Sequence, residues 1–190
     1  MKIQDSLEQR RTYYAINNNL PTDEETVISL IQKLTVLVPD SFNMKSSRVA
    51  VVFGENHEKL WDNIYNVFEG KVPRAKIDSF RAGAGTILYF YDENTVKGLQ
   101  EQFPPYAANF PVWANQSSGM LQLSIWSGLR ELGIGASLQH YNPVIDKMVH
   151  ETLGLPESFH LVAEMPFGGI SAEPEAKEKE DISKRVFVIR

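Results

Sequence analysis

The amino-acid sequence predicts an α+β fold in which helices outnumber strands. Hydrophobic residues make up 43% of the 190 positions, which supplies enough apolar side chains for a packed core and argues against wholesale disorder. Short runs rich in β-branched and aromatic residues alternate with stretches in which apolar residues recur at helical spacing. Neither an internal repeat nor a long linker interrupts this pattern, so we expect one domain that spans residues 1–190.

Two helices are expected before the first strand. Residues 5–16 predict a short helix that leads into a turn, and residues 22–38 predict the clearest helix of the chain. In the second helix, Thr22 and Glu25 form a T-x-x-E capping box, and the apolar residues that follow keep the helical period. Pro39 ends this helix, and a loop follows.

Strands and helices are then expected to alternate to the end of the chain. Runs of high β propensity predict strands at 48–53, 86–92, 159–168 and 185–189. Apolar periodicity predicts helices at 57–70, 93–103, 113–133 and 143–154. The helix at 113–133 has apolar residues on most faces, which indicates a position at the centre of the core or at a subunit interface.

Charge and composition exclude several functional classes. The formal net charge of −5 argues against nucleic acid as the main partner. The chain has no cysteine, which rules out disulfides, a thiol nucleophile and a cysteine metal site. Because neither a signal-peptide pattern nor a run of roughly 18 apolar residues occurs, we expect a soluble, cytoplasmic protein without a membrane span.

The familiar catalytic motifs are missing as well. The four histidines lie on different predicted elements without metal-ligand spacing, and His57 and His150 are expected on helix surfaces, so no metal site is predicted. A G-x-S-x-G nucleophile elbow does not occur. The glycine-containing stretch at 81–86 precedes a strand, whereas phosphate loops join a strand to a helix.

Three polar clusters remain as candidates for a binding site: Arg10–Thr12, the hydroxyl-rich loop at 39–48, and the charged stretch at 173–185. Each of them, taken alone, could also be an ordinary solvated or capping segment. In the third, Pro174 and the β-branched residues further on favour an extended backbone, in which residues two apart share a face. Lys177 and Lys179 would then converge on one point, which suits a phosphate.

Five stretches, which together span nearly the whole chain, carry a resemblance to a known family: "RRTYYAI", "PDSFNMKSSRVAVVFGENHEKLWD", "AGTILYFYD", "NQSSGMLQLSIWSGLRELGIGASLQHYNP" and "PEAKEKEDISKRVFV". In this order they resemble the FMN-dependent nitroreductases, and most closely a short subgroup related to the yeast fatty-acid repression mutant proteins and small bacterial nitroreductases. The resemblance implies an interlocked homodimer whose helices surround a central, mostly antiparallel sheet, with two FMN sites at the subunit interface. It also implies that the C-terminal strand adds to the partner's sheet and that the helix at 112–132 lies in the dimer core.

The resemblance assigns two groups of contacts to the FMN phosphate. The family's Arg-x-Ser pattern falls on Arg10 and Thr12, with Arg11 between them, and these residues would meet the phosphate and the ribityl chain. The family's Lys-x-Arg pattern falls on Lys177 and Lys179. Because a partly buried dianion needs several cations or oriented donors, these side chains would hold the phosphate without a P-loop.

A second part of the site is implied by the family's Pro-Ser-Ser-x-Asn-x-Gln loop, which falls on residues 39–45. Ser41 and Asn43 would reach the FMN of the other subunit. Asp40 replaces a hydroxyl residue and is not assigned to the cofactor, since a carboxylate near a phosphate is unfavourable. Lys45 replaces the usual glutamine and would add positive charge near the flavin.

The third part is the family's Leu-Gly-x-x-x-x-Pro stretch, which falls on residues 132–141 and implies that four residues line the isoalloxazine: Leu138, Gln139, His140 and Tyr141. A backbone N–H of this stretch would donate a hydrogen bond to flavin N5. His140 stands where some relatives have glutamate. Many relatives carry a lysine at the position of Tyr14, and Arg81 is expected to supply that cation instead.

The implied function is an oxidoreductase that works by ping-pong steps. NADH or NADPH would deliver hydride to the flavin, and a nitroaromatic or a quinone would then take the same place and accept the electrons; no catalytic side chain is predicted, because FMN carries the chemistry. Two alternatives stay open: a flavin-binding regulatory or stress-response protein with little turnover, and a flavin-free interaction protein that keeps the dimer fold. Four aromatic residues would either line the open flavin face or form ordinary core or dimer contacts: Phe42, Tyr106, Phe110 and Trp113.

Overall fold

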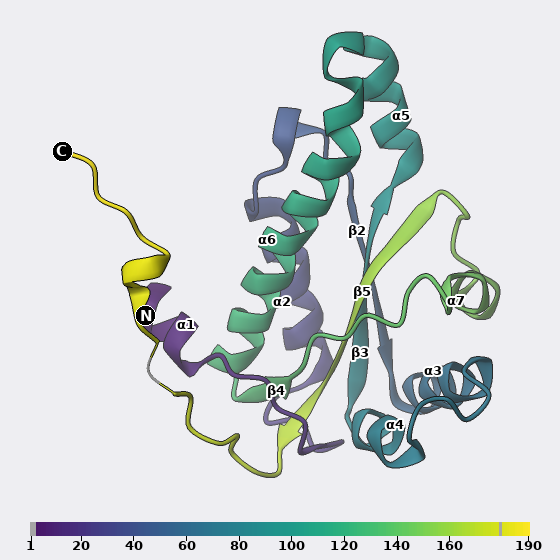
Figure 1. The fold of residues 1–190 in the computed structure, drawn as a ribbon. Coiled ribbons are helices and arrows are strands. Elements are labelled where there is room, and N and C mark those ends of the chain that lie inside the picture. Colours follow the sequence, from purple (N-terminus) through teal and green to yellow (C-terminus); the bar gives the residue numbers. More distant parts are fainter. Residues whose placement is uncertain (1–2, 179) are drawn as a thin grey trace.

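A five-stranded antiparallel sheet lies at the centre of the computed structural model, which describes residues 3–178 and 180–190 (Figure 1). Four strands follow the order β1-β5-β3-β2, and β4 pairs with β5 beside this path. The strands are β1 (Ile16–Asn17), β2 (Ser47–Phe53), β3 (Gly85–Asp92), β4 (Ile134–Ala136) and β5 (Phe159–Ile170).

Helices cover both faces of this sheet: α1 (Ile3–Gln9), α2 (Glu24–Leu37), α3 (Gly54–Val67), α4 (Arg74–Arg81), α5 (Glu93–Gln102), α6 (Phe110–Glu131) and α7 (Asp146–Leu153). Successive side chains of a strand point to opposite faces, and β3 divides accordingly. Ile87 and Tyr89 pack with α2 and α6 on one face, whereas Leu88 and Phe90 pack with α3, α4 and α7 on the other. The predicted α+β class with a mostly antiparallel sheet between helices is therefore confirmed.

The N-cap of the long helix α2 lies one residue later in the sequence than predicted. Asp23, and not Thr22, is the N-cap, and its carboxylate accepts a hydrogen bond from the Thr26 N–H at 2.6 Å. The aspartate is the stronger acceptor for the unpaired N–H groups of the first turn, so the box predicted from Thr22 and Glu25 is wrong by one position.

The first helix is shorter than predicted, because the chain leaves α1 to join the sheet. The Tyr13 N–H donates to the Ala136 carbonyl at 3.0 Å, and Thr12 forms a parallel bridge with Ala136. The chain at Thr12 and Tyr13 therefore runs beside β4, and Ile16 begins β1, instead of continuing the helix. The predictions missed β1 and β4, whose two and three residues are too few to show a periodicity.

Helix α4 was also missed by the sequence prediction. It has only eight residues and follows Pro73, and a proline at this point favours the prediction of a turn. Two signals identify it in retrospect: the buried pair Ile77 and Phe80 stands at helical spacing, and Arg74 pairs with Asp78 one turn later at 2.7 Å.

The C-terminal run at 185–189 forms no strand within the described chain, which contradicts the predicted fourth strand as an element of the single subunit. Its side chains are exposed, up to 96% for Ile189. A β-branched run becomes a strand only when it reaches a free sheet edge, and this segment extends away from the sheet of its own chain (Figure 1). Across residues 3–178 and 180–190, no helix combines the length and apolar character that crossing a membrane requires.

Candidate functional site

The first predicted cluster, Arg10–Thr12, lies where α6, β4 and the segment after β5 meet. Packing fixes the Arg10 guanidinium, whose central carbon lies 4.3 Å from the centroid of the Trp126 ring on α6. Arg11 donates a hydrogen bond from Nη2 to the Glu175 carbonyl. Thr12 is held by its bridge to Ala136. Three distant parts of the sequence are thereby brought to one place.

Within the described part of the chain, the two arginines form a cationic pair without an acidic partner. Neither forms an ion pair with another described residue, and the Nε atoms of both are buried without a hydrogen-bond partner there. Burial, and then the positive charge of Arg11, lower the pKa of the Arg10 guanidinium. Two adjacent cations with unsatisfied N–H groups are a natural receptor for an anion with several oxygen acceptors, such as a phosphate.

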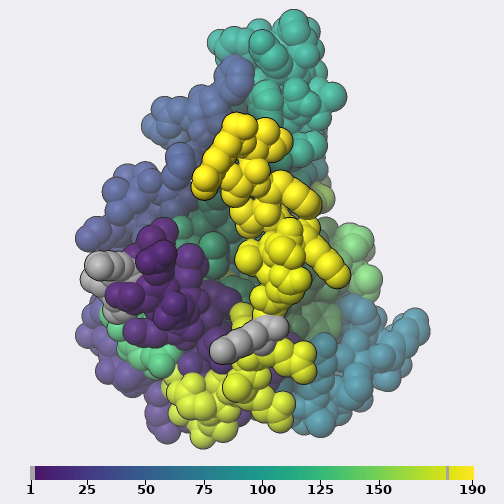
Figure 2. Space-filling model, turned by 60° about the vertical axis from the view of Figure 1, so that its left-hand side comes forward, coloured from purple at the N-terminus to yellow at the C-terminus, as the bar shows by residue number. Residues whose placement is uncertain are grey.

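The segment that follows β5 is anchored beside these arginines. The Ser171 N–H donates to the Ala15 carbonyl at 2.9 Å, and the Tyr13 hydroxyl donates to Glu173 Oε2 at 3.0 Å. Arg130 on α6 donates from Nε to the same Tyr13 hydroxyl at 3.1 Å. As Figure 2 illustrates, the C-terminal segment then crosses the face that also carries α1.

This anchoring decides where the predicted lysines lie. Lys177 is exposed and follows by two residues the Glu175 carbonyl that Arg11 holds, which leaves about 7 Å of extended chain between them. Glu175 is thus in contact with Arg11, and the place of Lys177 at the phosphate stays a prediction. Lys179 lies outside the described residues.

The predicted flavin-ring stretch runs along β5 with alternating hydrogen bonds. Gln139 and Glu164 exchange backbone hydrogen bonds at 2.7 and 3.0 Å, and the Tyr141 N–H donates to Glu164 Oε2 at 2.8 Å. The N–H groups of Leu138 and His140 donate to no other described residue. The side chains of Gln139 and Tyr141 are buried and that of His140 is exposed. Free backbone donors, more than these side chains, are therefore what the stretch offers to a ligand.

The loop that contains Ser41, Asn43 and Lys45 has an unusual backbone. Phe42, Asn43 and Lys45 all have positive φ, from 50° to 55°, which costs about 1–2 kcal/mol for each non-glycine residue. Asp40 compensates for part of this cost, because its Oδ2 accepts hydrogen bonds from the N–H and the hydroxyl of Ser46 at 2.7 and 2.9 Å. Its carboxylate therefore stabilises the loop, which explains a carboxylate at a position where a hydroxyl residue is usual in the family.

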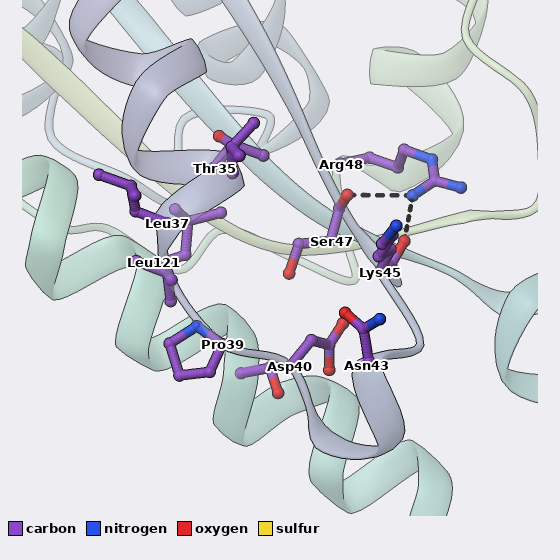
Figure 3. Close-up of a pocket in the computed structure, with 12 residues that line it drawn as sticks. Thr35, Leu37, Pro39, Asp40, Asn43, Lys45, Ser47, Arg48 and Leu121 are labelled. Atoms are coloured by element: carbon purple, nitrogen blue, oxygen red, sulfur yellow. Dashed lines mark hydrogen bonds between the residues drawn. The ribbon is translucent and has the colours of Figure 1, made fainter.

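The end of the loop is held by Arg48. Its Nη1 donates to the carbonyls of Lys45 and Ser47 (Figure 3). The same Nη1 donates to the Ser46 carbonyl, and its Nη2 lies 3.0 Å from Asp92 Oδ2. A cavity of about 400 Å³ opens beside the loop, and its lining includes Asn43, Lys45, Ser47, Arg48 and Ser117. The strained loop is thus fixed on one wall of an open cavity, as is typical of binding loops.

The predicted aromatic residues do gather around this loop. Phe42 is 50% exposed and lies within 5.9 Å, centroid to centroid, of the rings of four others: Phe103, Tyr106, Phe110 and Trp113. The Trp113 ring stacks on Phe42 with an interplanar angle of 18°. The cluster, hereafter the Phe42 cluster, is a partly exposed aromatic surface on which a flat molecule can stack.

Within one chain the two halves of the predicted site stay apart. The Ser41 N–H donates to Ser117 on α6, whereas Arg10 stacks on Trp126 nine residues further along the same helix. At the rise of an α-helix this corresponds to about 14 Å along its axis. The structure therefore brings Arg10–Thr12 together with β4 and with the segment that leads to Lys177, whereas the loop with Ser41, Asn43 and Lys45 lies apart from them.

Arg81 differs from the other predicted cations because its charge is already balanced. Its guanidinium forms ion pairs with Glu58 at 2.7 Å and with Asp62 at 3.1 Å. Its neighbour Phe80 packs against the Tyr14 ring, with centroids 6.2 Å apart, so α4 does lie beside the segment of Arg10–Thr12. The assignment of Arg81 to the cofactor stays a prediction that rests on the resemblance.

Two buried polar residues were not found by sequence reasoning. Glu164 is fully buried in β5, and the signal for it is a single acid within an otherwise apolar strand. His57 is also fully buried, which contradicts its predicted place on a helix surface, because the first turn of α3 faces the sheet. Its Nδ1 lies 2.8 Å from the Thr86 hydroxyl, and burial lowers the pKa of the imidazole to about 4. His150 is half-buried on α7.

Sheet, helices and arginine pair define an α+β protein with a candidate site for an anionic ligand. The chain belongs to the nitroreductase family, since the model of that family matches residues 7–169. It is accordingly an oxidoreductase of this family, whose members typically bind FMN.

Sequence and structure comparisons agree on this assignment. Two proteins of Saccharomyces cerevisiae, HBN1 and the nitroreductase FRM2, are 33% and 30% identical over 175 and 178 residues, with 90% of each chain covered. The nitroreductase CinD from Lactococcus lactis, solved in complex with chloramphenicol, is 43% identical, covers all of both chains and has a TM-score of 0.94. CinD was also solved with nicotinic acid and with 4-nitrophenol, at TM-scores of 0.93 and 0.94.

Proposed function

We propose that the chain is an FMN-dependent oxidoreductase that acts as a homodimer and transfers hydride equivalents from NADH or NADPH to nitroaromatic or quinone acceptors. One observation carries this proposal: two adjacent, partly buried guanidinium groups, which form no ion pair with any residue of 3–178 and 180–190, lie where α6, β4 and the segment after β5 meet. One domain over residues 1–190 would contain all of these parts. When bound, FMN supplies the two-electron chemistry for which the chain itself offers no redox-active group.

The arginine pair suits the phosphate end of FMN. A phosphate monoester carries up to two negative charges, and Arg10 and Arg11 supply two positive charges together with unsatisfied N–H donors. Thr12 follows directly and is held in the sheet, where its hydroxyl would meet the ribityl chain. Lys177 and Lys179 would close the site from the segment after β5.

The 138–141 stretch suits the ring end. The outward N–H groups of Leu138 and His140 would donate to the ring edge, and the rigid pairing of Gln139 with Glu164 would keep their direction fixed. Donors that are fixed before the ligand arrives need no reorganisation when negative charge develops on the ring edge.

A second copy of the chain would complete the site. Ser41, Asn43 and Lys45 lie about 14 Å along α6 from the arginine pair, so we propose that they contact the cofactor of the partner subunit. The surface supports such an assembly, because large apolar side chains are exposed on α1, α2, α6 and the C-terminal segment: Ile3, Leu7, Val36, Leu37, Val112, Met120, Leu123, Val186, Phe187, Val188 and Ile189. We propose that the run at 185–189 becomes a strand only on the partner's sheet.

The substrate class is argued from the Phe42 cluster and from CinD. Chloramphenicol and 4-nitrophenol, which were found bound to CinD, are both nitroaromatic compounds, and nicotinic acid is a pyridine carboxylic acid related to nicotinamide. In this chain, an exposed aromatic surface beside the left-handed loop would stack flat compounds of these kinds.

The test is the visible spectrum of the purified protein. We expect FMN to give an absorbance band at about 450 nm that disappears under anaerobic NADH or NADPH and returns with 4-nitrophenol or a quinone. A yellow protein that neither nucleotide bleaches would favour a flavin-binding regulatory protein. A colourless protein that takes up no added FMN would contradict the proposed function and leave an interaction protein with the family fold.

Replacing Lys177 and Lys179 together by alanine is expected to weaken FMN binding by a few kcal/mol, as two charge-assisted contacts to phosphate are lost. Fluorescence titration of the FMN-free protein measures this change. The control is the double alanine variant at Lys59 and Lys147, two exposed lysines on α3 and α7. Equal affinity of the two double variants would refute the phosphate role.

Phe42→Leu is expected to raise KM for 4-nitrophenol by about 2- to 10-fold, because stacking on an aromatic ring contributes about 0.5–1.5 kcal/mol. Leucine keeps an apolar side chain at the positive φ of this position, so the loop strain is unchanged. Steady-state kinetics at saturating NADH measure the effect, with Val144→Ala as an exposed apolar control. An unchanged KM would mean that the Phe42 cluster is only a packing or subunit contact.

A further inference from the structure

Glu164 is an acid placed in the apolar core behind the predicted flavin-ring stretch. It lies in the middle of β5 with an exposure of 0%, and Leu88 of β3 is its register partner. Residues directly opposite each other in an antiparallel pair point to the same face of the sheet. The Glu164 carboxyl therefore projects to the side of Leu88, where α3, α4 and α7 form an apolar cluster.

A backbone N–H group of the stretch that follows β4 holds this carboxyl. Oε2 accepts the Tyr141 N–H at 2.8 Å, and Oε1 is buried without a partner among the described residues. The Glu164 backbone adds two hydrogen bonds to Gln139, at 2.7 and 3.0 Å. Backbone and side chain of one residue thus bind two alternate residues of the same segment.

This arrangement determines which N–H groups of the segment remain free. The N–H groups of Gln139 and Tyr141 point inward to Glu164, so those of Leu138 and His140 point outward, as alternate residues of an extended chain do. An apolar side chain at position 164 would leave the Tyr141 N–H buried and unsatisfied, which favours rotation of the peptide groups around His140.

The surroundings of the carboxyl favour its protonated form. Burial raises the pKa of Glu164 to about 8, against the opposing effect of the Tyr141 N–H; the negative charge of Asp146 raises it further by a smaller amount, and the backbone N–H groups of Glu164 and Asn142 lower it. Asp146 lies at the start of α7, and the titratable groups that act on Asp146 are His150 and His160. A neutral carboxyl accepts the Tyr141 N–H at one oxygen without placing a full charge in the core.

We propose that Glu164 is a positioning residue for the cofactor, which holds the backbone of Gln139 and Tyr141 so that the N–H groups of Leu138 and His140 face the flavin ring. The inference rests on the proposed function, because it assigns a flavin to the outer side of this stretch. Glu164 itself would not touch the ring. Its role would be to set the direction of the N–H donors at the ring edge.

The experiment compares Glu164→Gln with Glu164→Met, two unbranched side chains of similar length. Glutamine keeps a neutral acceptor for the Tyr141 N–H, and methionine has none. Amide hydrogen exchange of the holoenzyme reads the backbone of residues 138–142, FMN titration gives Kd, and the visible circular dichroism and midpoint potential of the bound flavin read its contacts. Wild type is measured throughout.

We expect Glu164→Gln to match wild type, whereas Glu164→Met exchanges these amides about tenfold faster, raises Kd for FMN about tenfold and shifts the flavin potential. If Glu164→Met does not fold, Glu164→Asp is compared instead, because its shorter side chain withdraws the acceptor from Tyr141. Faster exchange with unchanged flavin affinity, spectrum and potential would overturn the inference and leave Glu164 a structural residue. Wild type that binds no FMN would instead refute the proposed function, so failure of the proposed function is distinguished from failure of the inference about Glu164.

Discussion

Arg10→Met is expected to raise Kd for FMN by about 10- to 100-fold, because a hydrogen bond between charged groups contributes about 1.5–3 kcal/mol. Methionine keeps an apolar stem that can pack on the Trp126 ring, where the guanidinium carbon now lies 4.3 Å from the centroid. The substitution therefore removes the charge and the donors with little change in packing. Titration of the FMN-free protein, followed by the change in flavin fluorescence, measures the loss.

A matched control separates the lost charge from the lost stacking. Arg74 also stacks on an aromatic ring, at 4.9 Å from the Tyr65 centroid, but its charge is balanced by Asp62 and Asp78. Arg74→Met is expected to leave FMN affinity unchanged. A Kd for Arg10→Met within twofold of wild type would show that the arginine pair is not the phosphate receptor.

Wild type is expected to lose about 2 kcal/mol of its free energy of unfolding between pH 6.5 and pH 9, relative to Glu164→Gln. The folded protein binds the Glu164 proton with a pKa of about 8, against an ordinary value of 4.5. Between these values the folded state holds a proton that the unfolded state has released, so stability falls as pH rises and levels off above pH 8. Glutamine does not titrate, and its variant should lack this decline.

The pH interval is chosen to avoid His57. The depressed pKa of this imidazole, about 4, makes the unfolded state bind more protons below pH 6.5, so the stability of both proteins rises with pH in that lower range. Urea unfolding of both proteins at pH 6.5, 7.5 and 9, with saturating FMN, gives the difference. Parallel curves over this interval would mean that Glu164 is ionised in the folded protein.

Much of the fold could be predicted because its signals are local. The strand β3 is rich in β-branched and aromatic residues, β5 is largely apolar, and the helical period of α2 and α7 is regular; Gly154 closes α7 in the left-handed conformation. The short pieces could not be predicted, because β1 and β4 exist only through pairing with β5, which the local sequence does not encode. The run at 185–189 is the converse case. Its composition favours a strand, but a strand forms only where the segment can pair with the free edge of a sheet.

The site divides in the same way. Arg10, Thr12 and Asn43 were predicted from the resemblance to family motifs. At two positions where the chain departs from those motifs, the structure shows what the side chain does: Asp40 stabilises the loop, and the ring of Tyr14 packs on α4. The pairing of Glu164 with Tyr141 joins residues 23 positions apart, and no motif indicates it. Burial of a polar side chain depends on the tertiary packing, which residue types alone do not specify.

The central claim is that this chain binds FMN in a site completed by a second copy. The direct measurement uses two variants, Arg10→Met and the double variant Ser41→Ala with Asn43→Gly. Each is unfolded and stripped of flavin, the two are mixed and refolded together, and the amount of FMN bound by the mixture is determined. Glycine suits the positive φ of position 43.

Each variant alone is expected to bind FMN weakly. In the mixture, half of the symmetric dimers would be hybrids with one intact site each, so about a quarter of all sites should regain wild-type affinity. A mixture that binds no more FMN than the average of its two components would contradict a site shared between subunits.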